Sequence, residues 1–226
     1  ISQHSVQKLL ALNLTVCSHL KYEGLLQTEN GYDQPGPLIA ELAGLFPGSP
    51  VIFLRAGLYP SIQQLDTLTR LLELTDQPLA LTLLSNADIS VNPFAGLQAP
   101  AGGLTGNPEE LVKLLAPGQL HTLSTWTDHF VLLSDDLVSR FSSPTSSQDL
   151  MHQLQAVGAA LKVPDHLFLH DEESKVFTPI KLQPHESAYP PPFSELSSRL
   201  QQWFNAGIAD IPPMHDKREP ATLHIT

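Results

Sequence analysis

The residues best placed to do chemistry follow two apolar runs in the first half of the chain. The run 51–54 is followed by the segment 55–57 (Arg-Ala-Gly), and the run 81–84 is followed by Ser85 and Asn86. Apolar runs with polar ends are typical of buried strands, and open α/β sheets bind ligands at the carboxyl ends of their strands. A divalent cation at the first strand end would need carboxylates, which 55–57 lacks. We predict that this strand end faces a site and brings it a positive charge.

His170 and the acids at 171–173 are of the types that bind metal ions. Imidazole and carboxylate groups at a strand end suit zinc or manganese, although consecutive acids on a turn are also commonly solvated. His166 falls on the same face of the predicted strand as His170. Cys17 beside a histidine would be a nucleophile, but a cysteine flanked by apolar residues is also a common core residue. Both interpretations stay open for each group.

Strands alternate with helices along the chain, which indicates an α/β sheet. A cap residue with proline or acids in the first turn marks several helix starts, including Asn107-Pro108 and Ser146 or Ser147 before Asp149. A carboxylate such as that of Asp149 complements the helix dipole. The pattern predicts strands at 12–17, 51–54, 79–84, 120–123, 130–133 and 167–169, and helices at 37–46, 61–74, 107–117, 134–141, 146–161 and 193–204.

Composition bounds the class of protein. Of the 226 residues 42% are hydrophobic and 15% are charged, which excludes a disordered chain or a coiled coil. The 12 basic and 23 acidic residues give a net charge of −11, which argues against a nucleic-acid partner. A single cysteine excludes an internal disulfide and suits a reducing compartment. No apolar run is long enough to span a membrane. We predict a globular, cytoplasmic protein.

The order of its segments gives the chain a family resemblance. It resembles the family 2 glycosyltransferases of the GT-A fold that build bacterial surface polysaccharides, over roughly residues 12–177. The resemblance implies a three-layer, Rossmann-like mixed sheet flanked by helices, with its first strand missing or replaced, and a C-terminal helix and linker. The matching segments, in order, are 29–32 (Glu-Asn-Gly-Tyr), 51–57, 83–86, 130–136, 147–150 and 170–177.

The resemblance also suggests roles for single residues. In the family, an Asp-x-Asp motif holds a divalent cation that bridges the nucleotide diphosphate. Here those positions fall on 55–57, so the usual metal ligands are absent and we expect no cofactor. Asp149 matches the catalytic base. The segments that contact substrate in the family place Arg55, Ser85, Asn86 and His170 as substrate-binding residues.

Two functions follow from the resemblance. The first is a catalytically silent domain, a pseudoenzyme in polysaccharide biosynthesis that serves as a scaffold or an acceptor-binding module. The alternative is an active, metal-independent sugar-nucleotide glycosyltransferase, in which Arg55 or a histidine neutralises the diphosphate and Asp149 is the general base.

The tail of the chain predicts a multidomain setting. Residues 1–177 are expected to form the degenerate glycosyltransferase domain, and 178–226 a helix and a proline-rich linker. The end, 223–226, resembles the opening strand of a GT-B glycosyltransferase domain. The predicted partners are therefore adjacent domains of the same polypeptide and a glycan acceptor, with neither nucleic acid nor a membrane span.

Overall fold

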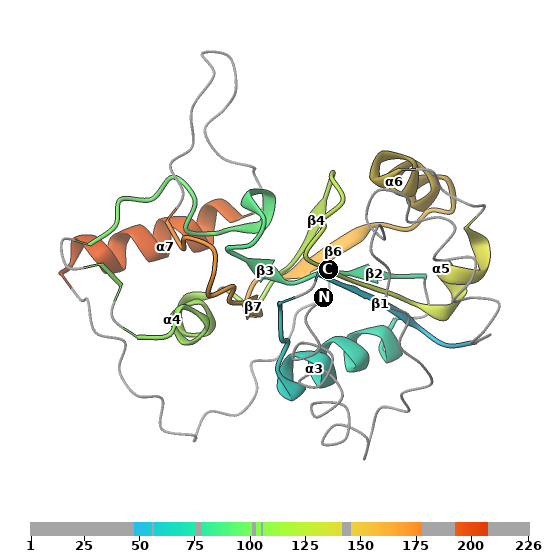
Figure 1. Cartoon of the computed structure of the whole chain (residues 1–226), viewed down its shortest axis with the longest axis horizontal. Helices are drawn as coiled ribbons and strands as arrows, with labels where there is room; N and C mark the ends of the chain where they lie inside the picture. Colours follow the sequence, from blue (N-terminus) through green and yellow to red (C-terminus); the bar gives the residue numbers. More distant parts are fainter. Residues whose placement is uncertain are drawn as a thin grey trace, which may run out of the picture. The chain divides into compact units, whose positions relative to one another are not determined.

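The computed structural model describes residues 48–55, 57–75, 78–100, 103–104, 106–141, 146–177 and 193–207, and they form a mixed α/β structure (Figure 1). The described residues fall into two compact units. The first unit holds those up to Thr82 and those from Ser124 to Leu161, and the second holds the rest. The strand and helix predicted at 12–17 and 37–46, and the boundary at 177/178 with the tail beyond 207, lie outside the described residues.

The first unit is built on an antiparallel sheet. Its central strand β5 (Phe130–Leu133) is buried along its whole length and pairs with β1 (Val51–Leu54) on one side and β2 (Ala80–Leu81) on the other. Leu133 of β5 lies opposite the first residue of each neighbour, and Phe130 lies opposite the last residue of β1. The carboxyl ends of β1 and β2 therefore lie at the edge where β5 begins.

The strand β1 forms as predicted, but it is not buried on both faces. Ile52 is 43% exposed, whereas Val51 and Phe53 on the opposite face are each 7% exposed. Alternate burial is typical of an antiparallel strand with one face toward the core. The prediction of a fully buried strand was therefore wrong for β1, because an apolar residue at each position does not determine how many faces are covered.

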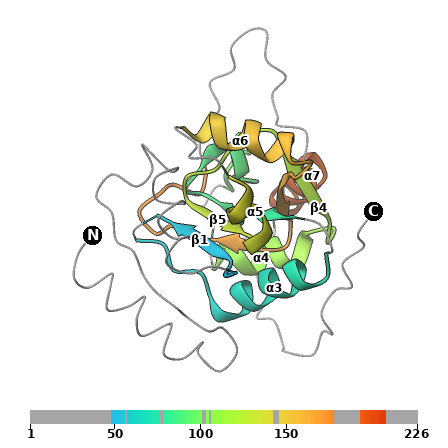
Figure 2. The same cartoon turned by 90° about the vertical axis from the view of Figure 1, so that its right-hand side faces the viewer.

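Helices α3 (Ile62–Glu73) and α6 (Ser147–Ala156) lie on opposite faces of this sheet (Figures 1 and 2). Ser61 starts α3 with a capping box: its hydroxyl accepts the Gln64 amide at 3.2 Å and the Gln64 side chain accepts the Ser61 amide at 2.7 Å. The short helix α5 (Asp135–Arg140) follows β5 directly. These three starts agree with the sequence patterns.

The predicted helix 146–161 ends early. Gly158 takes a left-handed conformation (φ +74°), and the Ala159 amide donates to the Leu154 carbonyl at 2.9 Å. This backbone arrangement closes a helix at a glycine. Leu161 then begins a strand, β6 (Leu161–Pro164), instead of ending a helix.

The second unit contains a parallel pair of short strands, β3 (Leu84–Ser85) and β7 (Phe168–Leu169). The predicted strand 79–84 is thus two strands, β2 and β3. Thr82 lies between them, and its hydroxyl donates to the Phe130 carbonyl at 2.6 Å. The strand β4 (Leu120–Leu123) forms where predicted, beside β6.

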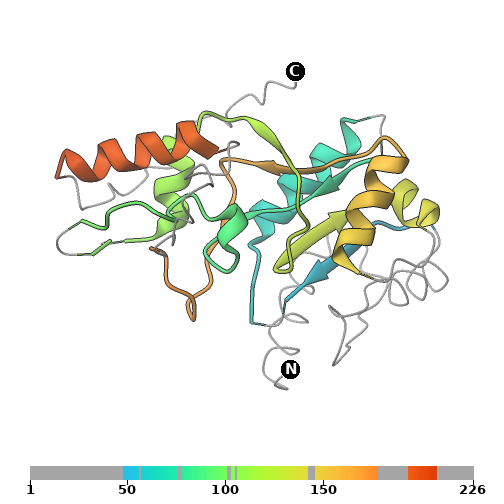
Figure 3. The same ribbon diagram turned by 90° about the horizontal axis from the view of Figure 1, so that it is seen from above.

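An aromatic cluster fills the core of the second unit. Phe94 lies just after the short 3₁₀ helix η1 (Ile89–Val91), and its ring contacts three other phenylalanines. Helix α4 (Pro108–Leu115) contacts both β7 and α7 (Ser194–Asn205), and Figure 3 shows α4 beside α7. The Asn107 side chain caps α4 as predicted, at 2.9 Å from the Glu109 amide. The partners of Phe94 are Phe168, Phe177 and Phe204.

Among the described residues, no helix is both long enough and apolar enough to cross a bilayer.

Candidate functional site

The polar residues that end β3 lie inside the second unit. Ser85 is paired with Leu169 of β7 and is fully buried, and its hydroxyl accepts the Ala87 amide at 3.0 Å. Asn86 is 6% exposed. Both residues were predicted to contact substrate. Both are buried, and they lie in the packing between β3 and the segment that follows β7.

Asn86 holds that segment with three hydrogen bonds. Its amide nitrogen donates to the carbonyls of Asp171, at 2.7 Å, and Ser174, at 2.8 Å. Its amide oxygen accepts the Asp171 backbone amide at 2.8 Å. An asparagine side chain has two N–H donors, and both are used here. Asn86 therefore serves as a clamp on the turn 171–174.

Asp171 closes the same turn from the other side. One carboxylate oxygen accepts the Glu173 amide at 3.1 Å and the other accepts the Ser174 hydroxyl at 2.6 Å. Glu172 and Glu173 are exposed. Of the three acids at 171–173, Asp171 therefore forms the turn, and Glu172 and Glu173 lie on the surface. Within the described residues, no group of three or more His, Cys, Asp or Glu side chains is placed to hold a metal ion.

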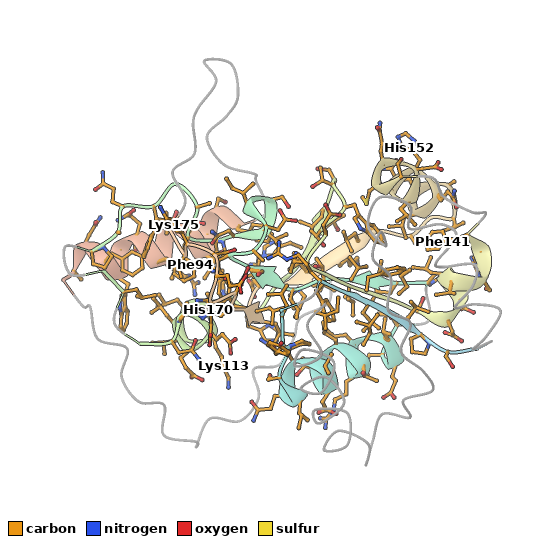
Figure 4. All side chains as sticks on the ribbon, in the orientation of Figure 1. Phe94, Lys113, Phe141, His152, His170 and Lys175 are labelled. Atoms are coloured by element: carbon orange, nitrogen blue, oxygen red, sulfur yellow. The ribbon has the colours of Figure 1, made fainter. Side chains whose placement is uncertain are left out.

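His170 is half-buried next to the start of α4 (Figure 4). Its backbone amide lies 3.4 Å from a carboxylate oxygen of Glu109. Burial raises the pKa of Glu109 above its ordinary value, although the amide and the ring of His170 oppose the rise. The residue that the sequence proposed for substrate thus lies beside a carboxyl group that burial makes harder to ionise.

The sequence reasoning missed a buried carboxylate in the second unit. Asp165 follows β6, and one of its oxygens accepts the backbone amides of Gly118, at 3.0 Å, and Gln119, at 2.9 Å. The other oxygen lies 3.4 Å from Nε2 of His121 on β4. Nδ1 of His166 is 3.8 Å from the first oxygen. This group, Asp165 with His121 and His166, is called the Asp165 cluster below.

The cluster favours the ionised carboxylate. Burial alone would raise the pKa of Asp165, but the imidazoles of His121 and His166 and the Gln119 amide outweigh it, so the pKa lies below its ordinary value. A carboxylate beside an imidazole can orient the ring for proton transfer. Here, however, the carboxylate also binds two backbone amides, and the ring of His121 packs edge-on against Phe193 at 5.4 Å. These contacts indicate that the cluster joins the 118–119 turn to the end of β6.

The sequence carried only a partial signal for the cluster. Asp165 follows the strand residues Leu161-Lys162-Val163-Pro164, in which Lys162 interrupts the apolar run that marked the ends of β1 and β3. The predicted helix through residue 161 also covered the start of this strand. His121 joins it only through the neighbouring strands β4 and β6, and this pairing is far apart in sequence.

Arg55 lies in the first unit, immediately after β1. Its backbone amide donates to the His129 carbonyl at 2.9 Å, and its own carbonyl accepts the Leu58 amide at 3.3 Å. Gly57 then turns the chain with a φ of +92°. A divalent cation does not fit this strand end, because Arg55 brings a positive charge and Gly57 has no side chain to offer.

Asp149 also lies in the first unit, in the first turn of α6, as predicted. Its backbone amide donates to the Ser146 hydroxyl at 3.2 Å, which identifies Ser146 as the cap. Its side chain is partly exposed. Of the five residues proposed for a site, Arg55 and Asp149 belong to the first unit, and Ser85, Asn86 and His170 to the second.

Searches of protein-family models, curated proteins and solved structures each gave no match to this chain.

Proposed function

We propose that this chain is a catalytically silent, glycosyltransferase-like domain that serves a larger polysaccharide-assembling protein as a scaffold or an acceptor-binding module. The observation that carries the proposal is the internal use of Asn86. Under the sequence resemblance, Asn86 matches a segment that contacts substrate in the family, and its amide bonds to the backbone of 171–174 through three contacts of 2.7–2.8 Å. A side chain committed in this way has no donor left for a sugar nucleotide.

The end of β1 supports the same proposal. A sugar nucleotide presents two phosphates, and a departing diphosphate needs its charge neutralised. Arg55 is one cation at that strand end, but no carboxylate pair accompanies it in 55–57. One arginine does not reproduce the bridging of both phosphates by a divalent ion. A binding or scaffold role requires no such bridging.

Titration calorimetry with UDP-, GDP- and dTDP-sugars, each with and without manganese, tests the proposal. We expect no binding in the micromolar range, because neither strand end provides a diphosphate site. Tight binding of any of these nucleotides would contradict a silent domain. A glycosyltransferase with intact Asp-x-Asp carboxylates, titrated alongside, provides the positive control for nucleotide quality.

If a nucleotide does bind, the active alternative becomes the hypothesis to test. Asp149→Asn keeps the shape of the side chain but removes the basic oxygen that would accept the proton of the acceptor hydroxyl. Loss of transfer with nucleotide binding retained would identify Asp149 as the base. Unchanged transfer would exclude it.

A further inference from the structure

The loop 124–129, which leads into β5, presents an aromatic side chain at the edge of the first unit. Trp126 in this loop is half-buried, and Ser124, Thr125 and Asp128 around it are exposed. The hydrogen bond from the Arg55 amide to the His129 carbonyl, at 2.9 Å, joins the loop to the end of β1. An arginine, a tryptophan and several short polar side chains thus share one edge of the sheet.

The tryptophan is anchored on one side. Its ring contacts Phe53 of β1 in an edge-to-face arrangement, with ring centroids 6.4 Å apart and planes at 74°. Phe53 itself is 7% exposed. Aromatic pairs in this geometry stabilise a protein by more than the area that they bury would predict. The indole therefore packs against a core residue on one side, and the residue is partly accessible to solvent.

Buried hydrogen bonds hold the base of the loop. The hydroxyls of Thr127 and Thr82 lie 2.9 Å apart, and both are fully buried. Both hydroxyls also lie within hydrogen-bonding distance of the Phe130 carbonyl, at 3.2 Å from Thr127 and 2.6 Å from Thr82, so their two protons serve two of these three contacts. These bonds fix the residue next to Trp126 to the first residue of β5 and to the residue that follows β2. A fixed aromatic ring loses little conformational entropy when a ligand packs on it.

We propose that Trp126, with Thr125, Asp128 and Arg55, forms a carbohydrate-binding surface for an acceptor glycan. A pyranose ring has an apolar face of C–H groups that packs on an indole, and hydroxyl groups at its rim that hydrogen-bond to short polar side chains. An apolar platform with a few polar groups around it meets both needs. This inference rests on the acceptor-binding form of the proposed function and names the residues that would perform it.

The fluorescence of Trp126 can report the binding of a glycan to the proposed surface. The chain has two tryptophans, and the other, Trp203, lies on α7 in the second unit. In a Trp203→Phe background, all tryptophan emission comes from the proposed surface. We would titrate this variant with maltohexaose, chitohexaose and hexagalacturonic acid to about 10 mM, which brings a site with a Kd of about 1 mM close to saturation.

We expect a saturable change in Trp126 emission with at least one of these neutral, amino-sugar-derived or acidic glycans. Binding by the variants is then followed by NMR titration. Trp126→Phe keeps an aromatic face and should bind within about tenfold of the parent. Trp126→Leu keeps apolar contact with Phe53 but has no flat face, and should show no saturation. Thr125→Ala, at an exposed position, should weaken binding several-fold without affecting folding.

No response to any of the three glycans, or equal binding by Trp126→Leu, would overturn the inference. Either result would leave the silent-domain proposal in place, because that proposal fails only if a sugar nucleotide binds. Circular dichroism of each variant shows whether it is folded. If Trp126→Leu does not fold, Trp126→Phe and Thr125→Ala carry the test.

Discussion

The ends of β1 and β3 have the same sequence pattern and different surroundings. At the end of β1, Arg55 is half-buried and lies beside a loop in which Ser124, Thr125 and Asp128 are exposed. At the end of β3, Asn86 is buried and bonds to the turn after β7. The parallel partner β7 brings a second strand end next to Asn86, whereas β5 runs antiparallel to β1. The difference teaches that a polar residue after an apolar run predicts an edge of a sheet, and that the neighbouring strand decides whether the residue is structural.

The strongest test of this comparison is Asn86→Ala. The change leaves the Asp171 amide and two carbonyls in the 171–174 turn without their partner, and unsatisfied buried groups cost about 1–3 kcal/mol each at most sites. We expect the free energy of unfolding to fall by about 3 kcal/mol. Urea unfolding of a Trp126→Phe background, in which Trp203 reports on the second unit, measures the loss.

Gln202→Ala is the matched control for that experiment. Gln202 also has an amide side chain and belongs to the second unit, but it is exposed on α7. Its removal should change stability by less than about 0.5 kcal/mol. If Asn86→Ala were as mild as the control, the amide would not be a structural clamp, and a role in ligand binding would regain support.

The sequence predicted local elements well because their causes are local. The caps Ser61 and Asn107 mark the starts of α3 and α4, and the apolar run of β5 marks a buried strand. The end of α6 was missed although Gly158 provides the stop, because the apolar residues after it continue a helical spacing. No local pattern predicts which strands pair. The parallel pairing of β3 with β7 and the antiparallel pairing of β1 with β5 could therefore not be read from the sequence.

The same limit explains the site residues. Arg55 and Asp149 occupy the strand end and the helix start that were predicted for them. Asn86 was assigned to substrate through the family resemblance, and its bonds to Asp171 and Ser174 could not be predicted because they span more than eighty positions of the chain. The Asp165 cluster was not predicted for the same reason, because His121 contacts the carboxylate from a strand that is distant in the sequence.

A smaller effect is expected from Asp165→Asn. The amide can still accept the backbone amides of Gly118 and Gln119, so only the charge and its attraction to His121 and His166 are lost. We expect a cost of about 1–2 kcal/mol at neutral pH. If Asp165→Asn lowered the free energy of unfolding as much as Asn86→Ala does, the charge of Asp165, and not its hydrogen bonds, would be what holds the 118–119 turn.

The effect of Asp165→Asn should depend on pH. The pKa of Asp165 in the folded protein lies below its ordinary value of 3.8, so the folded state favours the ionised form. Its contribution is present above about pH 4 and is lost as the pH falls through the lower folded pKa. The difference between parent and variant in urea unfolding should shrink from neutral pH toward pH 3. Asp66→Asn, which breaks an exposed pair with Arg70 on α3, is the control and should cost less than about 0.5 kcal/mol.

The smallest effect is expected from Asp149→Asn in the first unit. A partly exposed carboxylate in the first turn of α6 interacts with the helix dipole, and its removal should cost about 0.3–1 kcal/mol. Unfolding of the Trp203→Phe background, in which Trp126 reports on the first unit, measures it. Ser146→Ala removes the cap of the same helix and should cost about 1 kcal/mol, so it calibrates the reporter. A stability loss in this range, with the glycan response of Trp126 unchanged, would identify Asp149 as a helix-start residue. Lost glycan binding at unchanged stability would instead place Asp149 on the ligand surface and bring the end of β1 closer to a working site than the end of β3.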